Sequence, residues 1–557
     1  MYIFWTRGVS GDFATTSNWI PAAVPGPADE AIIGANGTYT VTSSVDETMD
    51  SLIIAQKHAT LFITGPSAFT MTNGGVNDGT IVVDSDSSMV LGTNTTNTTL
   101  LNVGTIDLNG LLWIGQEGPL VTDSLTGEGH INLSGGEIIS GIEGVTVVSD
   151  NTISGTGSMN FSAGGQEAHG TWINQGIVDA STPNGTLTIG HTFIDNSSIL
   201  EATNGGLLNL EVAPVDNAAQ GVVEAKGENS EVIMGGNLSS GNDTNAGLIA
   251  AVHSGTLLIQ DVTIDNFVNT TNGTIEAGHG STVGLEYGGH IVGGLVTVLQ
   301  GGLLEAGGSA SILPLPGTIT GAVVTNAGTI GAEGANLTIV GDVTNTGTLD
   351  ANNATLVIDG AVSGGKATIE GTGEIEFGGA SAAHVTFAVA NSDAILKLDD
   401  PSAFTGTVSG LTTGDYIDLT NINFADSPTL SYSSKTHVLT VTDSVSDVTD
   451  TITFKGVVGS FSAQTDGSGG TLISDPPATV TVSHDSFVFA PNLGENTIAN
   501  FNAHNDAIDP PKSEFADFAG LLAQEHQDGA IPVAHDATDI VHHTDALTAQ
   551  HAHDFLV

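Results

Sequence analysis

Carboxylates are the most abundant ionisable side chains in this chain. The 557 residues include 61 Asp and Glu but only 8 Lys and Arg, which gives a formal net charge of −53. Crowded carboxylates are stabilised by a screening divalent cation, and an all-oxygen ligand set favours Ca²⁺. Ca²⁺ is therefore the candidate ion. The closely spaced acids that could hold it are Asp84, Asp86, Asp399, Asp400, Asp443, Asp447 and Asp450. The alternative for each group is a solvated acidic surface.

The shortage of basic residues excludes several classes of partner. One arginine, Arg7, and seven scattered lysines cannot form a basic patch, so we expect no binding to nucleic acid or to anionic membranes. The absence of Cys excludes disulfides, thiolate catalysis and Cys-based zinc sites. No apolar run is long enough to predict a transmembrane helix. Histidines gather after residue 484, where His542, His543, His551 and His553 could bind Zn²⁺ or Ni²⁺, or be polar residues without a ligand.

The acids and bases do not form a recognisable catalytic pattern. A glycosidase needs two carboxylates that face one sugar bond, whereas adjacent strand residues such as Asp399 and Asp400 point to opposite faces. Uronan lyases often use an Arg or Lys base, and Arg7, Lys226 and Lys366 are far apart in the sequence. No GxSxG, P-loop or HExxH motif occurs. We predict a protein without enzymatic activity; the alternative is a secreted polysaccharide lyase or glycosidase.

A recurring phrase organises the chain from about residue 35 to residue 390. It consists of Asn, one or two small residues, Gly and alternating apolar positions that end in Ala. Copies are NQGIVDA at 174–180, NAGLIAA at 245–251, NGTIEA at 272–277, NAGTIGA at 326–332 and NTGTLDA at 345–351. A second short strand pattern follows most copies. Many Asn-to-Asn steps fall between about 19 and 25 residues, the length of one turn in a coil of strands.

This period predicts an all-β fold, a right-handed parallel β-solenoid over residues 35–390. Alternating apolar and polar residues indicate half-buried strands, and Gly and Asn suit the corners. Asn side chains at equivalent corners are expected to stack into a hydrogen-bonded ladder. Ile330 and Leu349 should stack inside the coil, and Asp350 should face outward. A series of antiparallel β-sandwiches is the alternative.

Residues 1–34 differ from the repeats and predict an N-terminal cap. The segment carries Trp5, Phe13 and Trp19 together with three prolines, and a solenoid needs bulky residues to cover its first open turn. The stretch resembles the opening of many secreted bacterial β-repeat proteins. A sugar-binding aromatic platform is the alternative function for these residues.

The pattern changes again in the last third of the chain. Residues 391–477 predict a β-rich module of strand pairs, and 395–476 resemble a module of rhizobial-type secreted β-repeat proteins through GDYIDLTNI, LSYSSKTHVLTVTD and DGSGGTLI. Residues 484–509, HDSFVFAPNLGENTIANFNAHNDAID, resemble the closing segment of type I-secreted, RTX-like proteins. The Ca²⁺-binding nonapeptide of that family, GGxGxDxUx, is absent.

The resemblance implies that residues 478–557 form a small α/β secretion region. A helix is expected at 513–524, and the last residues, Asp554, Phe555, Leu556 and Val557, match an uncleaved type I export signal. The expected partners are the type I secretion machinery and an extracellular polysaccharide or cell-surface ligand. We therefore expect a secreted or cell-surface protein with a structural or adhesive role, or a surface-layer protein that assembles with Ca²⁺.

Overall fold

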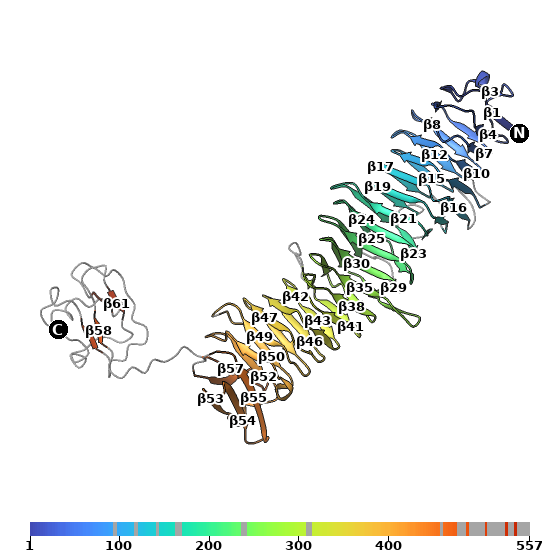
Figure 1. Ribbon diagram of the computed structural model, residues 1–557. Helices are drawn as coiled ribbons and strands as arrows, with labels where there is room; N and C mark the ends of the chain where they lie inside the picture. Colours follow the sequence, from blue (N-terminus) through green and yellow to red (C-terminus); the bar gives the residue numbers. More distant parts are fainter. Residues whose placement is uncertain are drawn as a thin grey trace. The chain divides into compact units, whose positions relative to one another are not determined.

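The protein folds as an all-β chain with almost no helix. The computed structural model describes residues 1–475 except 93–96, 116–120, 141–143, 162–169, 236–241, 308–314, 391 and 457–459, and beyond 475 it describes only four short strands. The chain divides into two compact units, Met1–Asp475 and Pro476–Val557. The larger unit contains a parallel β-solenoid of about 15 turns (Figure 1), which confirms the predicted all-β parallel solenoid. No helix among the described residues is long and apolar enough to cross a membrane.

A complete turn consists of three short strands joined at corners. In one turn these are β23 (Thr192–Asn196), β24 (Ile199–Thr203) and β25 (Leu207–Val212). In the next turn they are β26 (Val215–Asn217), β27 (Val222–Lys226) and β28 (Glu231–Gly235). Each strand pairs in parallel with its counterpart one turn later. Equivalent residues therefore form columns along the stack, as in other repeat folds where each turn contacts its neighbours.

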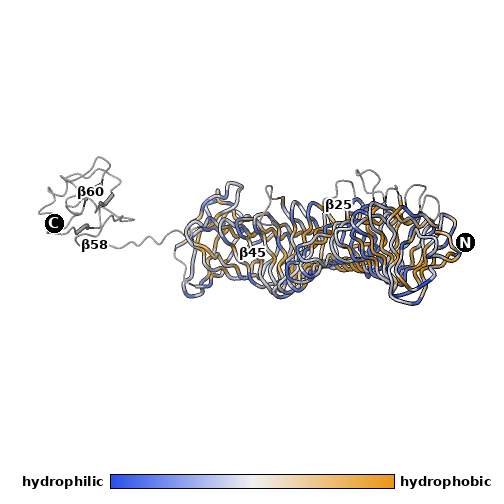
Figure 2. The backbone as a smooth tube through the Cα atoms, turned by 90° about the horizontal axis from the view of Figure 1, so that it is seen from above, coloured by the Kyte–Doolittle hydropathy of each residue, from blue (hydrophilic) through white to orange (hydrophobic). Residues whose placement is uncertain are grey.

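Alternate residues of every strand fill the interior. Ile330 of β42 (Thr329–Glu333) pairs with Leu349 of β45 (Thr348–Asn352), and both side chains are fully buried, as predicted. Asp350, the next residue, lies on the outer face and is half-buried between neighbouring side chains. Figure 2 shows the resulting interleaving of apolar and polar stretches along the solenoid. The core is a continuous apolar column because every turn contributes the same pattern.

Buried asparagines link the turns through their side-chain amides, which confirms the predicted ladder. Most steps join successive turns, whereas Asn102–Asn151 spans the intervening turn of β16 (Thr122–Thr126). In each step the Nδ2 of one Asn donates to the Oδ1 of the next. The donor–acceptor steps are Asn77–Asn102, Asn102–Asn151, Asn174–Asn196, Asn196–Asn217, Asn217–Asn245, Asn245–Asn266 and Asn326–Asn345, at 2.7–2.9 Å. Nδ2 of most members also donates to a backbone carbonyl of the following turn, for example Asn217 to Leu248. Hydrogen bonding of both amide atoms is what makes a buried Asn tolerable.

The repeated phrase changes its place on the turn along the chain. Asn245 ends β29 (Asp243–Asn245), the first strand of its turn. Asn326 ends β41 (Val323–Asn326), the second strand of its turn, and pairs with Val298. Val298 is the register partner of Ala277 one turn earlier, and Ala277 is that of Ala251. Asn326 therefore belongs to the column of Ala251 and not to that of Asn245. The same phrase therefore forms one corner in the first part of the solenoid and the next corner in the later part.

Aromatic side chains cluster in the first turn. Trp5, Phe13 and Trp19 are buried, and the Trp19 ring lies edge-on to the other two, with centroids 5.0 Å from Trp5 and 4.8 Å from Phe13. Trp19 Nε1 donates to the Phe13 carbonyl at 2.7 Å. Strand β1 (Tyr2–Trp5) pairs antiparallel with β3 (Trp19–Ile20) on one edge and parallel with β4 (Glu30–Ile33) on the other.

The parallel stack continues past residue 390, where we expected a different module to begin. Strand β50 (Ile395–Leu398) and strand β52 (Tyr416–Leu419) extend the parallel ladder by two steps. The antiparallel pairing of this region follows these two strands. It comprises β53 (Thr429–Ser433), β54 (Val438–Asp443) and β55 (Val448–Phe454), and β56 (Ser462–Thr465) with β57 (Thr471–Ser474), which also pairs with β52.

The second unit is described only through four strands. Strand β58 (Ser486–Val488) pairs in parallel with β59 (Ala507–Asp509), and β60 (Ala530–Pro532) pairs antiparallel with β61 (Ile540–His542). The helix predicted at 513–524 and the predicted signal residues Asp554, Phe555, Leu556 and Val557 lie outside the described residues.

Candidate functional site

Asp84 and Asp86, the first pair of acids predicted to bind Ca²⁺, lie at a corner of the solenoid. Asp84 is half-buried, and its Oδ2 accepts a hydrogen bond from Thr64 Oγ1 at 3.0 Å. Its Oδ1 accepts the backbone N–H of Ser85 at 3.0 Å. Asp86 is exposed. The hydrogen bonds of Asp84 fix the corner and join it to the preceding turn.

Asp443, Asp447 and Asp450 lie in the β54–β55 hairpin, but their carboxylates serve different contacts. Asp443 accepts the backbone N–H groups of Val445 and Ser446 and the Ser446 hydroxyl, so it closes the turn of the hairpin. Asp447 is exposed. Asp450 is buried, and its Oδ2 accepts a hydrogen bond from Asn421 Nδ2 at 2.9 Å. Burial raises the pKa of Asp450, and the charge of Asp400 raises it further.

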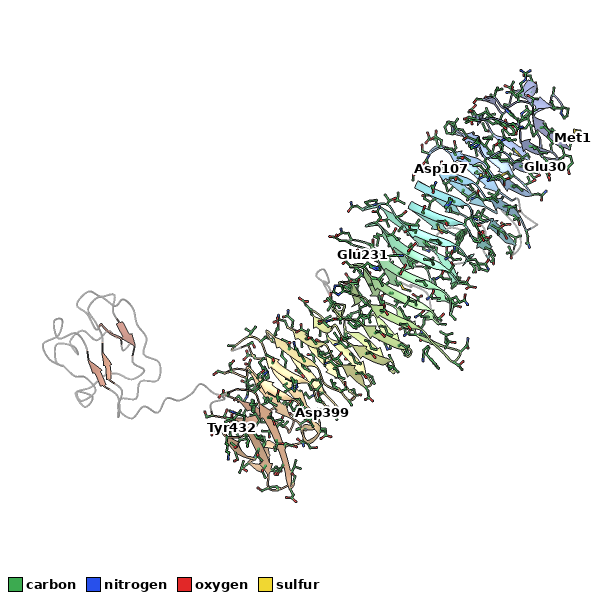
Figure 3. All side chains as sticks on the ribbon, in the orientation of Figure 1. Met1, Glu30, Asp107, Glu231, Asp399 and Tyr432 are labelled. Atoms are coloured by element: carbon green, nitrogen blue, oxygen red, sulfur yellow. The ribbon has the colours of Figure 1, made fainter. Side chains whose placement is uncertain are left out.

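The adjacent residues Asp399 and Asp400 belong to different surroundings. Asp400 Oδ1 accepts a hydrogen bond from the Ser402 hydroxyl at 2.6 Å, and the negative charge of Asp400 raises the pKa of Asp450. Asp399 instead lines a cavity at the distal end of the stack, and Figure 3 labels it there beside the antiparallel strands. Across the described residues, no three His, Asp or Glu side chains already form a group that could hold a metal ion.

The cavity beside Asp399 gathers acidic side chains from four elements: β48 (Glu374–Phe377), the corner after β50, strand β52 and the turn before β57. We call it the distal acidic pocket. It has a volume of about 430 Å³ and is lined by Glu374, Lys397, Asp399, Asp418, Thr420, Asp466, Ser468 and Gly470. Lys397 of β50 and Asp418 of β52 are register partners on neighbouring strands. Asp466 comes from the turn between β56 and β57, where β57 pairs with β52.

Asp418 is the most buried acid of this pocket. Only 8% of its surface is exposed, and its Oδ1 is buried without a hydrogen-bond partner among the described residues. Burial raises the pKa of Asp418 to about 6, and the charge of Asp466 contributes to the rise. Lys397 lowers this pKa, but its ammonium group forms its ion pair with Glu376, at 3.1 Å. The pocket therefore holds an excess of negative charge close to a desolvated carboxylate.

Sequence reasoning identified Asp399 but missed Asp418, Asp466, Glu374 and Lys397. Asp418 stands in the phrase GDYIDLT and Asp466 in DGSGG, both of which carried the resemblance to secreted repeat proteins. The closely spaced pairs that we searched for lie within one strand, where neighbours point apart. Column alignment of the turns finds only the neighbouring pair Lys397 and Asp418. Asp466 reaches the pocket through the antiparallel pairing of β57 with β52, which no local sequence signal announces.

A second group of acids lies on the outer face of the third strands. Glu305 lies one turn before Gly331, and Gly331 one turn before Asp350, in one outward column. Burial raises the pKa of Glu305 to about 7 and that of Asp350 to about 6, and Glu333 contributes to both shifts. These carboxylates are packed between neighbouring side chains of the sheet surface and have no ion-pair partner among the described basic residues.

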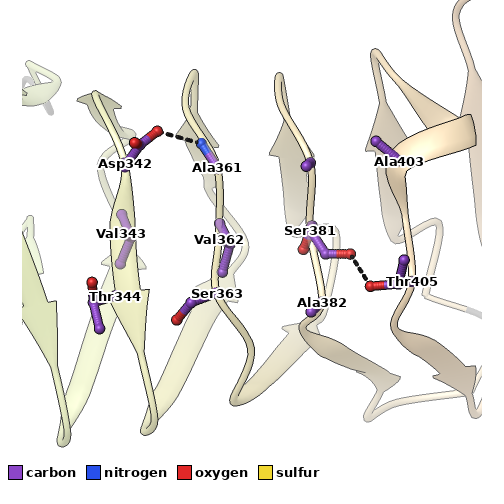
Figure 4. Close-up of a pocket in the computed structure, with 11 residues that line it drawn as sticks. Asp342, Val343, Thr344, Ala361, Val362, Ser363, Ser381, Ala382, Ala403 and Thr405 are labelled. Atoms are coloured by element: carbon purple, nitrogen blue, oxygen red, sulfur yellow. Dashed lines mark hydrogen bonds between the residues drawn. The ribbon is translucent and has the colours of Figure 1, made fainter.

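A shallow groove of about 440 Å³ crosses four successive turns (Figure 4). Small residues line most of it, including Ala361, Ser363 and Ser381. After β44 (Val343–Asn345), the second strand of the turns that line the groove is reduced to isolated bridges. Asp342 Oδ1 accepts a hydrogen bond from the backbone N–H of Ala361, in the next turn, at 2.8 Å. The groove offers van der Waals contact and hydroxyl groups but no aromatic side chain for stacking on a sugar ring.

Comparison with known proteins adds no family to this picture. No protein-family model matches the chain, and no curated protein is significantly similar to it in sequence.

Proposed function

We propose that the protein is a secreted, non-enzymatic structural or adhesive protein of the bacterial surface or extracellular matrix. The observation that supports this most is the uninterrupted parallel solenoid, in which outward positions repeat at every turn. A repeated surface can make many weak contacts with a polymer, and their combined avidity is high without a deep pocket. The strong negative charge favours uncharged or Ca²⁺-bridged glycans over anionic partners.

Three finer features belong to the same proposal. The solenoid is right-handed, the usual hand of parallel strand crossovers. The aromatic cluster of Trp5, Phe13 and Trp19 caps its first turn, since it covers core residues such as Phe69, whose ring centroid lies 5.3 Å from that of Phe13. Residues 478–557 form the export region, with Asp554 and Phe555 to Val557 as the type I signal.

The export part of the proposal has a direct test. Deletion of residues 480–557 should retain the protein in the cytoplasm of a host that carries a type I exporter, and fusion of residues 478–557 to an unrelated reporter should export the reporter. A fusion in which Phe555, Leu556 and Val557 are replaced by serine is the matched control and should stay inside. Export of the truncated protein would refute this assignment.

Binding and catalysis separate the adhesive function from its main competitor. The competing class is a polysaccharide-active enzyme, and the distal acidic pocket is where it would act, because a carboxyl with a raised pKa beside ionised acids is typical of general acids. The full chain should be retained on immobilised glycan. After incubation with uronan polymers, it should release neither new reducing ends nor unsaturated products. Product formation that Asp418→Asn abolishes would replace the adhesive function by an enzymatic one.

A further inference from the structure

Two carboxylates from different elements face one another in the distal acidic pocket. Asp418 projects from β52, and Asp466 lies in the turn that precedes β57. A Cβ atom placed on Gly470 would stand 2.8 Å from Asp466 Oδ2 and 3.2 Å from Asp418 Oδ1. Both oxygens therefore border the same small space, which is open because residue 470 has no side chain.

The turn fixes Asp466 in this position. Its Oδ1 accepts the backbone N–H of Ser468 at 2.7 Å and that of Gly469 at 2.8 Å. These two bonds leave Oδ2 directed toward Gly470 and Asp418. An acceptor held by two backbone donors cannot turn away from a second acceptor without breaking the turn.

Asp418 contributes a carboxylate oxygen that receives no hydrogen bond from the described residues. Its Oδ1 is buried without a hydrogen-bond partner among the described residues, and the side chain is more than nine-tenths buried. A desolvated carboxylate oxygen without a partner is destabilising, because burial removes its water and supplies no donor in exchange. Two carboxylates this close are stable together only when a cation or a shared proton lies between them.

The surroundings favour a cation. Glu374 and Asp399 add negative charge to the wall, whereas the one basic residue of the pocket, Lys397, is paired with Glu376. We propose that the distal acidic pocket binds a partly hydrated divalent cation, with Asp418 and Asp466 as its carboxylate ligands. Hard divalent cations take oxygen ligands and often keep several waters when only one or two carboxylates bind them. The cavity of about 430 Å³ has room for those waters, each of which needs about 30 Å³.

This inference goes beyond the adhesive function and does not depend on it. The bound cation would join β52, the last parallel strand of its own sheet, to the antiparallel strand β57, because its two ligands come from β52 and from the turn before β57. It would thus fasten the end of the solenoid.

The test compares the full chain with three variants by calorimetric titration of CaCl₂ and MgCl₂ at constant ionic strength. D418N and D466N remove one negative charge each, and Asn at 466 retains the Oδ1 that accepts Ser468 and Gly469. Both variants should fold, and both should bind the tightest equivalent of Ca²⁺ or Mg²⁺ at least tenfold more weakly. The exposed residue Asp86 gives the matched control, D86N, which should bind as the parent does.

A fourth variant tests the space itself. G470A places a methyl group between the two carboxylates, so it should also weaken binding at least tenfold without changing any charge. Equal affinities in the parent chain, D418N and D466N would overturn the proposal. A parent chain that binds neither ion tightly would also overturn it. In that case a shared proton would satisfy the two carboxylates, and the melting temperature should rise on acidification in the parent chain but not in D418N.

Discussion

Replacement of Asn217 by alanine tests whether the asparagine ladder holds the turns together. Asn217 Oδ1 accepts from Asn196 Nδ2 at 2.7 Å, and its Nδ2 donates to Asn245 Oδ1 at 2.7 Å. Nδ2 also reaches the carbonyls of Gly221 and Leu248, each at 3.2 Å. Alanine removes all four contacts within a fully buried site, because Asn217 has no exposed surface.

The size of the effect follows from what each former partner retains. Asn196 Nδ2 still donates to the Val222 carbonyl, and Asn245 Oδ1 still accepts from Gly247, so these two groups lose only part of their bonding. Two carbonyls also lose a donor. At about 1 kcal/mol for each weakened group, N217A should lower the free energy of unfolding by roughly 3–4 kcal/mol.

Chemical denaturation followed by circular dichroism measures this loss, and hydrogen exchange shows where it falls. Exchange should accelerate in β23, β26 and β29, the first strands that the ladder joins, before it does elsewhere. Asn132 provides the matched control, since it is exposed and its Nδ2 donates to Asp107 Oδ1 at 2.8 Å on the outer face. N132A should cost less than about 0.5 kcal/mol. Equal losses in the two variants would refute the reasoning that buried amide bonding stabilises the stack.

Three further predictions concern the core, its charges and its first turn. Leu349→Asp should cost several kcal/mol because it buries an unpaired carboxylate, whereas Asp350→Asn should leave the melting temperature at pH 7.5 unchanged or raised, since the pKa of Asp350 is already raised to about 6; equal shifts would mean that the inward and outward positions are misassigned. Burial raises the pKa of Asp243 to about 7, so the folded chain holds its proton where the unfolded chain releases it, and stability should fall as pH rises from about 4 to 7. Melts of Asp243→Asn should therefore show a gain at pH 8 that disappears by pH 4, and a loss at pH 8 would show that the ionised form is the one the fold stabilises. Trp19→Ala should cost about 3–5 kcal/mol and speed hydrogen exchange in the first turns, and undisturbed exchange in β1 and β4 would argue against a capping role.

The repeat phrase was sufficient to predict the parallel coil, the inward position of Ile330 and Leu349 and the existence of an Asn ladder. It could not predict which corner each Asn occupies, because Asn245 and Asn326 stand in nearly identical phrases and a corner has no local sequence that identifies its neighbours one turn away. The extension of the stack beyond residue 390 was missed for the same reason, since ILKL at 395–398 alternates like any strand of a hairpin.

The acidic pocket was beyond reach for a different reason. Asp418 and Asp466 meet only because β57 folds back antiparallel onto β52, a pairing that depends on the register between distant segments. Short-range spacing of acids, which guided the choice of Asp443, Asp447 and Asp450, instead found residues that close a turn or bond to Asn421.

The ladder from Asn174 to Asn266 also gives the solenoid an electrical direction. Every amide donates toward the C-terminal side, and its orientation is fixed because Nδ2 also faces backbone carbonyls, so the amide dipoles add rather than cancel. The series begins at Asn174 with a buried Oδ1 that has no donor among the described residues and ends at Asn266, whose Nδ2 meets the Gly293 and Leu295 carbonyls. An Asn in a turn inserted inside the series would find a donor in the Asn of the turn before it and an acceptor in the Asn of the turn after it. A turn joined at the Asn174 end must supply a donor, so the two ends of the ladder are chemically different and the stack can lengthen most easily from within.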